Sequence, residues 1–159
     1  MKAALRPHAL LRSPAFPFLL LAFALGPIGL GAIESLASWG VLALPDLPGL
    51  PGHRMSLTAI ALSLLVAPLM EELAFRAAIQ DYLSHQRWAQ KQWCGLSVPN
   101  VLTSVLFAAC HIPTHSLALA LLTFFPSLVF GKAKEASGRL RWSIALHAWF
   151  NLCFIWHFF

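Results

Sequence analysis

The chain has 159 residues, of which 58% are apolar and 11% are charged, and its formal net charge is +5. A typical soluble domain has about 25% charged residues, so this chain could not cover a globule of its size with polar side chains. The composition therefore predicts a membrane protein. At about 20 residues per span, the length fits five to six spans and leaves no room for a nucleotide-binding, extracellular or nucleic-acid-binding domain.

The predicted fold is an all-α, polytopic membrane bundle of about five to six transmembrane helices. One integral membrane domain is expected over residues 1–159, with its motif-bearing core at about 55–159. Three scattered cysteines are too few for a disulfide framework or a Cys-x-x-Cys metal site.

The first apolar run covers residues 16–44 and follows three basic residues among the first twelve. This order is typical of a signal peptide, but no small-x-small cleavage site ends the run, so an uncleaved first span is favoured and a cleaved one stays the alternative. Glycines and a proline within residues 26–31 are expected to kink the span or break it into two. Glu34 lies in the same run and needs a partner.

Residues 45–52 hold three prolines and two glycines and are predicted to form a linker. Further spans are predicted at about 55–82, 98–112, 116–131 and 142–159. With a cytoplasmic N-terminus, five spans place residues 1–13 and the predicted loops 83–97 and 132–141 inside. These segments hold three, two and four of the eleven Lys and Arg residues, as the positive-inside rule expects.

The second apolar run carries Glu71, Glu72 and Arg76. A charge at the bilayer centre costs about 2.5–3.5 kcal/mol, so these groups need compensation. Glu72 and Arg76 are four residues apart on one helix face and are expected to pair, while Glu71 points about 100° away. Glu71 is therefore expected to face the bundle interior without a local partner. In the alternative interpretation, the whole cluster lies near the cytoplasmic end and reaches the headgroups.

His111 lies in the third predicted span, and His147 and Asn151 lie in the fifth. Either histidine alone is typical of a polar residue that bonds a backbone carbonyl between helices. Counted from the span ends, however, Glu71, His111 and Asn151 lie at similar depths, and His147 is one turn from Asn151 on the same face. A carboxylate, two imidazoles and a carboxamide around one cavity could hydrolyse a peptide bond without a covalent intermediate.

Three motifs occur in order: Glu-Glu-x-x-x-Arg at 71–76, Phe-x-x-x-His at 107–111 and His-x-x-x-Asn at 147–151. In these motifs the sequence resembles the CPBP intramembrane proteases, which include the type II CAAX prenyl endopeptidases and bacteriocin-processing or immunity proteins. The resemblance implies a glutamic-type endopeptidase that needs no cofactor or metal. In it Glu71, helped by His111, activates water. His147 and Asn151 form the oxyanion site, and Glu72 and Arg76 are a supporting pair.

The resemblance also implies the partners: the lipid bilayer and a membrane-associated protein cleaved near its C-terminus, with no nucleic acid. The chain has fewer spans before the first motif than the eukaryotic prenyl-protein proteases. A C-terminal sorting tail, as clipped by myxosortases, is therefore a second substrate class beside the prenyl-CAAX proteins. The expected location is a bacterial inner membrane, with the N-terminus in the cytoplasm.

Other functions stay open at this point. A zinc protease could use His111 and His115, which are four residues apart, but Pro113 lies between them and no His-Glu-x-x-His is present. A serine protease is disfavoured because no Gly-x-Ser-x-Gly occurs. A non-enzymatic immunity or binding protein, or a transporter, could bury the same charges.

Overall fold

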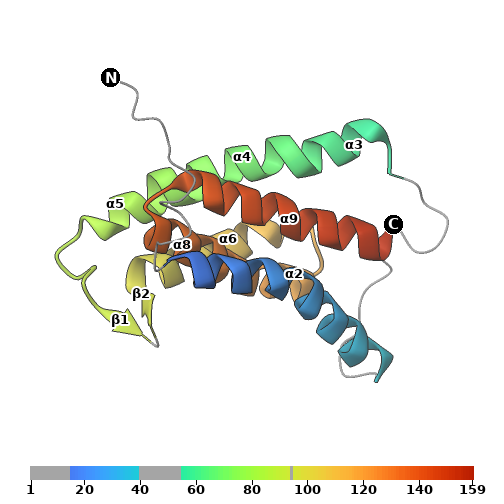
Figure 1. The fold of residues 1–159 in the computed structure, drawn as a ribbon, viewed down its shortest axis with the longest axis horizontal. Helices are drawn as coiled ribbons and strands as arrows, with labels where there is room; N and C mark the ends of the chain where they lie inside the picture. Colours follow the sequence, from blue (N-terminus) through green and yellow to red (C-terminus); the bar gives the residue numbers. More distant parts are fainter. Residues whose placement is uncertain (1–14, 40–54, 94) are drawn as a thin grey trace.

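The structure of the chain is a computed structural model, and it describes residues 15–39, 55–93 and 95–159. Its helices form five rods, drawn in Figure 1. In chain order the rods are α2 (Ala15–Ser38); a second rod of α3 (Leu57–Ala61), η1 (Leu62–Val66), α4 (Ala67–Glu72), η2 (Leu73–Gln80) and α5 (Asp81–Ser84); α6 (Val98–His111); α7 (Leu117–Leu122) with α8 (Phe124–Ser137); and α9 (Leu140–Phe158). The predicted all-α bundle is confirmed.

Three of the described helical stretches are long and apolar enough to cross a bilayer: Phe16–Ser35, Leu57–Ser84 and Leu117–Ser137. The chain is therefore an integral membrane protein. The third predicted span is the 14-residue helix α6, whose length of about 21 Å is less than the roughly 30 Å of a hydrocarbon core. The fifth is the 19-residue helix α9.

The helix α2 is continuous through Pro27, so this segment forms one span and the alternative in which it breaks into two is wrong. Proline has no N–H and leaves the carbonyl four residues earlier without its helical donor. That carbonyl belongs to Phe23, and the indole Nε1 of Trp149 on α9 donates to it at 2.8 Å. Gly26 gives the indole room, since a Cβ there would lie 3.3 Å from Nε1. The bond compensates the proline, and the helix goes on.

A second proline has a similar effect in the second rod. Its π-helix η1 ends with the N–H of Ala67 donating to Leu62, five residues earlier. In this register the donor for the Ser63 carbonyl would be residue 68, which is proline. The side chain of Asn151 on α9 donates to that carbonyl at 2.8 Å through Nδ2. Side chains of α9 thus bond the backbone of both flanking rods.

The helix α9 lies between the second rod and α2 (Figure 1), and α8 packs against both α9 and α6. The buried apolar core joins α2, α8 and α9 and consists of Leu19, Ala22, Phe130, Ala133 and Leu146. Close packing of α8 on α6 depends on Gly131, because a Cβ there would lie 2.0 Å from the side-chain oxygen of Asn100.

Two predicted loops contain regular structure. Residues 132–137 continue α8, which ends at Gly138 with a φ of 65°, so most of the predicted basic loop is helical. Lysines near a helix C-terminus interact favourably with its dipole, and glycine is the usual residue after the last turn. Within 83–97, strand β1 (Gln92–Trp93) pairs antiparallel with β2 (Leu96–Ser97). The basic N-terminus, the predicted linker and residues 40–44 lie outside the described residues.

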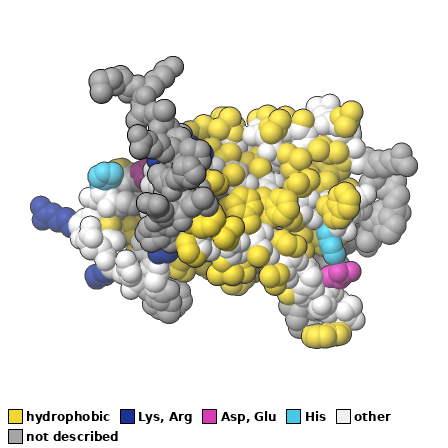
Figure 2. Space-filling view, viewed as in Figure 1, with side chains coloured by type: hydrophobic (Ala, Val, Ile, Leu, Met, Phe, Trp, Pro, Cys, Tyr) yellow, Lys and Arg dark blue, Asp and Glu magenta, His cyan; other side chains and the backbone are white. Residues whose placement is uncertain are grey.

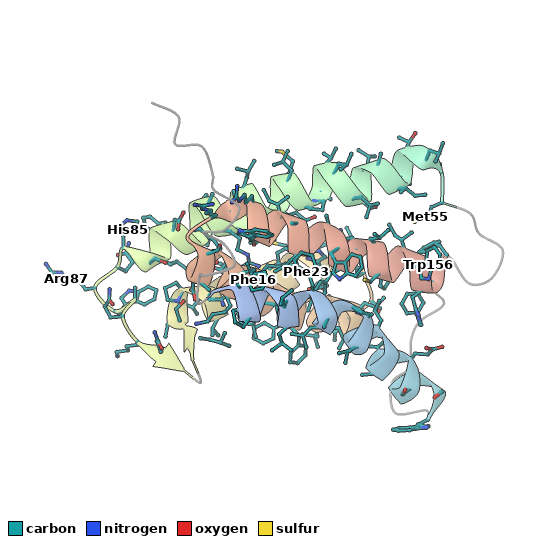
Figure 3. The ribbon with its side chains drawn as sticks, in the orientation of Figure 1. Phe16, Phe23, Met55, His85, Arg87 and Trp156 are labelled. Atoms are coloured by element: carbon teal, nitrogen blue, oxygen red, sulfur yellow. The ribbon has the colours of Figure 1, made fainter. Side chains whose placement is uncertain are left out.

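The surface of the bundle differs between its middle and one of its ends. Figure 2 shows apolar side chains over the middle of the visible face, with Lys and Arg side chains at one end. Figure 3 places His85 and Arg87 at that end, and Met55 and Trp156 at the other. An apolar surface of this kind suits contact with lipid chains.

Candidate active site

Three helices bring their ionisable side chains together inside the bundle: Glu71 on α4, His111 at the end of α6 and His147 on α9. Glu71 Oε2 lies 3.7 Å from His147 Nε2 and 3.9 Å from His111 Nε2. Among the described residues this oxygen, although buried, has no hydrogen-bond partner. The sequence prediction that Glu71 faces the bundle interior without a local partner is confirmed.

Each of the two imidazoles is oriented by a hydrogen bond at its Nδ1 atom. His111 Nδ1 lies 2.8 Å from the Phe107 carbonyl. A carbonyl can only accept, so Nδ1 is the donor of this bond and Nε2 faces Glu71. His147 Nδ1 lies 3.0 Å from Glu72 Oε1, and its ring stacks on Phe130 with centroids 4.8 Å apart. The neighbouring helices thus orient both Nε2 atoms toward the same carboxylate.

Glu72 is at the centre of a fully buried polar cluster. Arg76 Nε donates to Glu72 Oε2 at 3.1 Å, and both side chains are 0% exposed. The predicted Glu72–Arg76 pair is therefore confirmed, and the alternative in which these charges reach the headgroups is wrong. The hydroxyl of Ser143 also bonds Glu72, while Arg76 Nη2 donates to the hydroxyl of Ser127 at 2.6 Å.

The sequence did not predict that Ser127 and Ser143 belong to this polar cluster. Serine is common where membrane helices pack, so its presence alone does not mark a site. One signal was available for Ser143, which precedes His147 by four residues and therefore lies on the same face of α9. The partner of Glu34 was also missed: Glu34 Oε2 lies 3.2 Å from Nε2 of His157, near the end of α9.

Asn151 lies one turn beyond His147 on α9 and bonds the Ser63 carbonyl through Nδ2. A carboxamide nitrogen has two hydrogens, so one remains for another acceptor. Asn151, His111 and His147 all line a cavity of about 430 Å³ between α2, α6, α7, α8 and α9. Glu71 is not among the residues that line this cavity. It lies behind His111 and His147, which do line it.

Few side chains of this site could act as metal ligands. The helix α6 ends at His111, before Pro113, and in the following turn the N–H of His115 donates to the His111 carbonyl at 3.0 Å. Their ring centroids are 5.3 Å apart. Among the residues that the structure describes, however, no three His, Cys, Asp or Glu side chains are grouped so that they could hold a metal ion.

A family model described as type II CAAX prenyl endopeptidase, Rce1-like, matches residues 53–153, which is more than half of the chain. The chain belongs to this family. Rce1-like proteins are intramembrane peptide hydrolases, so the predicted enzyme class is confirmed. The match includes all three motifs and every residue of the cluster around Glu71 and Glu72. No curated protein and no solved structure matches the chain.

Proposed function

We propose that this Rce1-like protein is a glutamic intramembrane endopeptidase in which Glu71 activates the attacking water. The observation that carries the proposal is the unpartnered Glu71 Oε2, which faces two imidazole nitrogens at 3.7 and 3.9 Å. These separations are too long for direct hydrogen bonds, so neither imidazole occupies the carboxylate of Glu71, whose side chain is 30% exposed and open to a water. A carboxylate within hydrogen-bond reach of a water can act as its general base.

In this mechanism the water oxygen attacks the peptide carbonyl carbon while one water proton passes to Glu71. The proton then passes from Glu71 to the leaving nitrogen, the C–N bond breaks, and an acid and an amine are released. His147 and the free amide hydrogen of Asn151 are the proposed donors to the oxyanion. Glu72 Oε1 lies 3.0 Å from His147 Nδ1, so the Nε2 atom of His147 is turned toward Glu71. Glu72 holds that imidazole as the aspartate of a catalytic triad does.

The distribution of basic residues supports an orientation. Apart from the buried Arg76, every Lys and Arg that the structure describes lies at the end formed by α5, the hairpin and the α8–α9 turn. We propose that this end faces the cytoplasm, as the positive-inside rule favours, and that the membrane is a bacterial inner membrane.

The cavity extends from the imidazoles toward the opposite end, where Ile33 and Phe158 line it. In the proposed orientation it is therefore reached from the extracytoplasmic half of the bilayer. This favours a membrane protein with a C-terminal sorting tail over a prenyl-CAAX protein presented at the cytoplasmic face.

Mass spectrometry of membrane-protein C-termini tests this function. Cells with and without the gene are compared, and the proposal expects shortened C-termini only in cells that contain the protein. Identical C-termini in both would contradict it.

Chelation separates the proposed mechanism from the zinc alternative. Cleavage by isolated membranes should continue in the presence of a strong chelator, because the proposed base is Glu71. A loss of cleavage that zinc restores would favour a metalloprotease instead.

A further inference from the structure

The cavity beside the imidazoles is suited to an uncharged, apolar guest. Its lining is mostly Leu, Ile, Val and Phe side chains from five helices, and among the described residues no Lys, Arg, Asp or Glu lines it. At about 430 Å³ it is within the usual size range of ligand sites. Away from the imidazoles and Asn151, a charged group in such surroundings would lose its hydration without a partner.

The cavity adjoins the proposed catalytic side chains, so a group bound in it lies close to the reacting bond. His111, His147 and Asn151 line it, and these side chains surround the proposed water and oxyanion. A group in the cavity therefore belongs to a substrate residue next to the cleaved bond.

One side of the cavity is formed by α2, whose Gly26, Gly29, Leu30 and Ile33 share a helix face and line it. The two glycines differ. A Cβ at Gly26 would meet the indole of Trp149 at 3.3 Å, whereas a Cβ at Gly29 would meet nothing within 4 Å. Because Gly29 also lines the cavity, a side chain at residue 29 would take up space at the wall of the cavity.

This part of α2 is bonded to α9 on both sides of Gly29. Trp149 donates to the Phe23 carbonyl at 2.8 Å, and Glu34 lies 3.2 Å from His157. Because both bonds hold α2, added volume at residue 29 should narrow the cavity rather than displace the helix.

We propose that Gly29 determines specificity by leaving room for a bulky, uncharged apolar residue next to the cleaved bond. This inference rests on the proposed function and adds a substrate preference to it. A larger side chain at residue 29 should shift that preference to small residues, as in other hydrophobic pockets that select by size.

The test uses the full-length protein in membranes and a reporter protein that ends in a tail cleaved by the wild type. The reporters carry Ala, Leu or Phe at each position flanking the cut. For Gly29→Leu we expect cleavage of the reporter with the favoured large residue to fall about 10- to 200-fold at one position. Cleavage of the matching Ala reporter should change much less.

Gly31→Leu is the matched control, because Gly31 is on the same helix, does not line the cavity, and also has open space at its Cβ. It should cut all reporters as the wild type does. Gly29→Ala should shift the preference in the same direction to a smaller degree, and it serves when Gly29→Leu does not fold. Unchanged preferences in folded Gly29 variants would overturn the inference, as would an equal loss on all reporters.

The proposed function is tested in the same experiment by Glu71→Gln. A wild type that cuts no more than Glu71→Gln would overturn the proposed function and this inference together. An active wild type, an inactive Glu71→Gln and a Gly29→Leu with wild-type preferences would overturn the inference alone.

Discussion

Two neighbouring glutamates have different surroundings because successive residues of a helix point about 100° apart. Glu72 is 0% exposed and bonds Arg76, His147 and Ser143. The side chain of Glu71 is 30% exposed, and its inner oxygen has no hydrogen-bond partner among the described residues. An ionisable carboxylate without a structural partner is suited to chemistry, whereas the fully bonded Glu72 is suited to supporting its neighbours.

Arg76→Ala should lower the amount of folded protein. The substitution leaves Glu72 buried without its counter-ion, and breaking a buried pair from one side costs about 3–5 kcal/mol. The check is the amount of monodisperse protein after detergent extraction, with Glu71→Gln as the matched control. A well-folded Arg76→Ala that is as inactive as Glu71→Gln would instead assign the arginine to the reaction.

Asn151→Ala should fold and keep a residual activity. Loss of one oxyanion donor typically lowers the rate about 10²–10³-fold, while the lost bond to the Ser63 carbonyl costs on the order of 1 kcal/mol. Cleavage rates at equal amounts of folded protein check this. A wild-type rate would exclude Asn151 from the oxyanion site.

Residue types alone predicted only part of this site. Glu71, Glu72, Arg76, His111 and His147 stand out because ionisable groups are rare in apolar helices. The serines do not, since the contacts of a small hydroxyl depend on which helix faces it. The bond between Asn151 and the Ser63 carbonyl depends on a π-helical turn that no residue pattern marks.

At the scale of elements, two prolines leave backbone carbonyls free, and a neighbouring rod donates hydrogen bonds to them. Pro27 and Pro68 each leave a carbonyl without its helical donor, and Trp149 and Asn151 of α9 bond these two carbonyls. A free carbonyl in a bilayer is costly unless another group donates to it. The same residues that interrupt hydrogen bonding within a helix therefore attach that helix to its neighbour.

A double-mutant cycle tests this connection. Trp149→Phe should lower the thermal midpoint of the protein, because the Phe23 carbonyl loses its donor. In a Pro27→Ala background the new N–H of residue 27 can donate instead, so Trp149→Phe should cost less there. Equal losses in both backgrounds would show that the indole acts by packing alone.

The positions of the helices were predictable from apolar runs, but their ends and internal geometry were not. The helix α8 continues past the predicted end because Lys132 and Lys134 can extend from it: Lys132 Nζ donates to the Gly95 carbonyl, and Lys134 pairs with Asp81. The sequence left a break in α2 open as an alternative, because the donor that compensates Pro27 comes from a helix more than a hundred residues away.

At the scale of the whole molecule, the basic end and the cavity lie toward opposite sides of the bundle. A cysteine replacing Arg87 should therefore be shielded from a membrane-impermeant maleimide in intact cells. A cysteine replacing Thr114, which is exposed in the turn after α6, should react. Both are placed in a chain whose native cysteines are replaced by serine. The reverse labelling pattern would invert the proposed orientation.

The role of Glu71 is the central claim, and one measurement tests it most directly. Wild type and Glu71→Gln are purified, reconstituted at equal amounts of folded protein, and compared for release of a cleavable tail. Glutamine has nearly the same shape but cannot take the proton of a water, so Glu71→Gln should fold normally and release no tail. Release by Glu71→Gln at the wild-type rate would contradict the account.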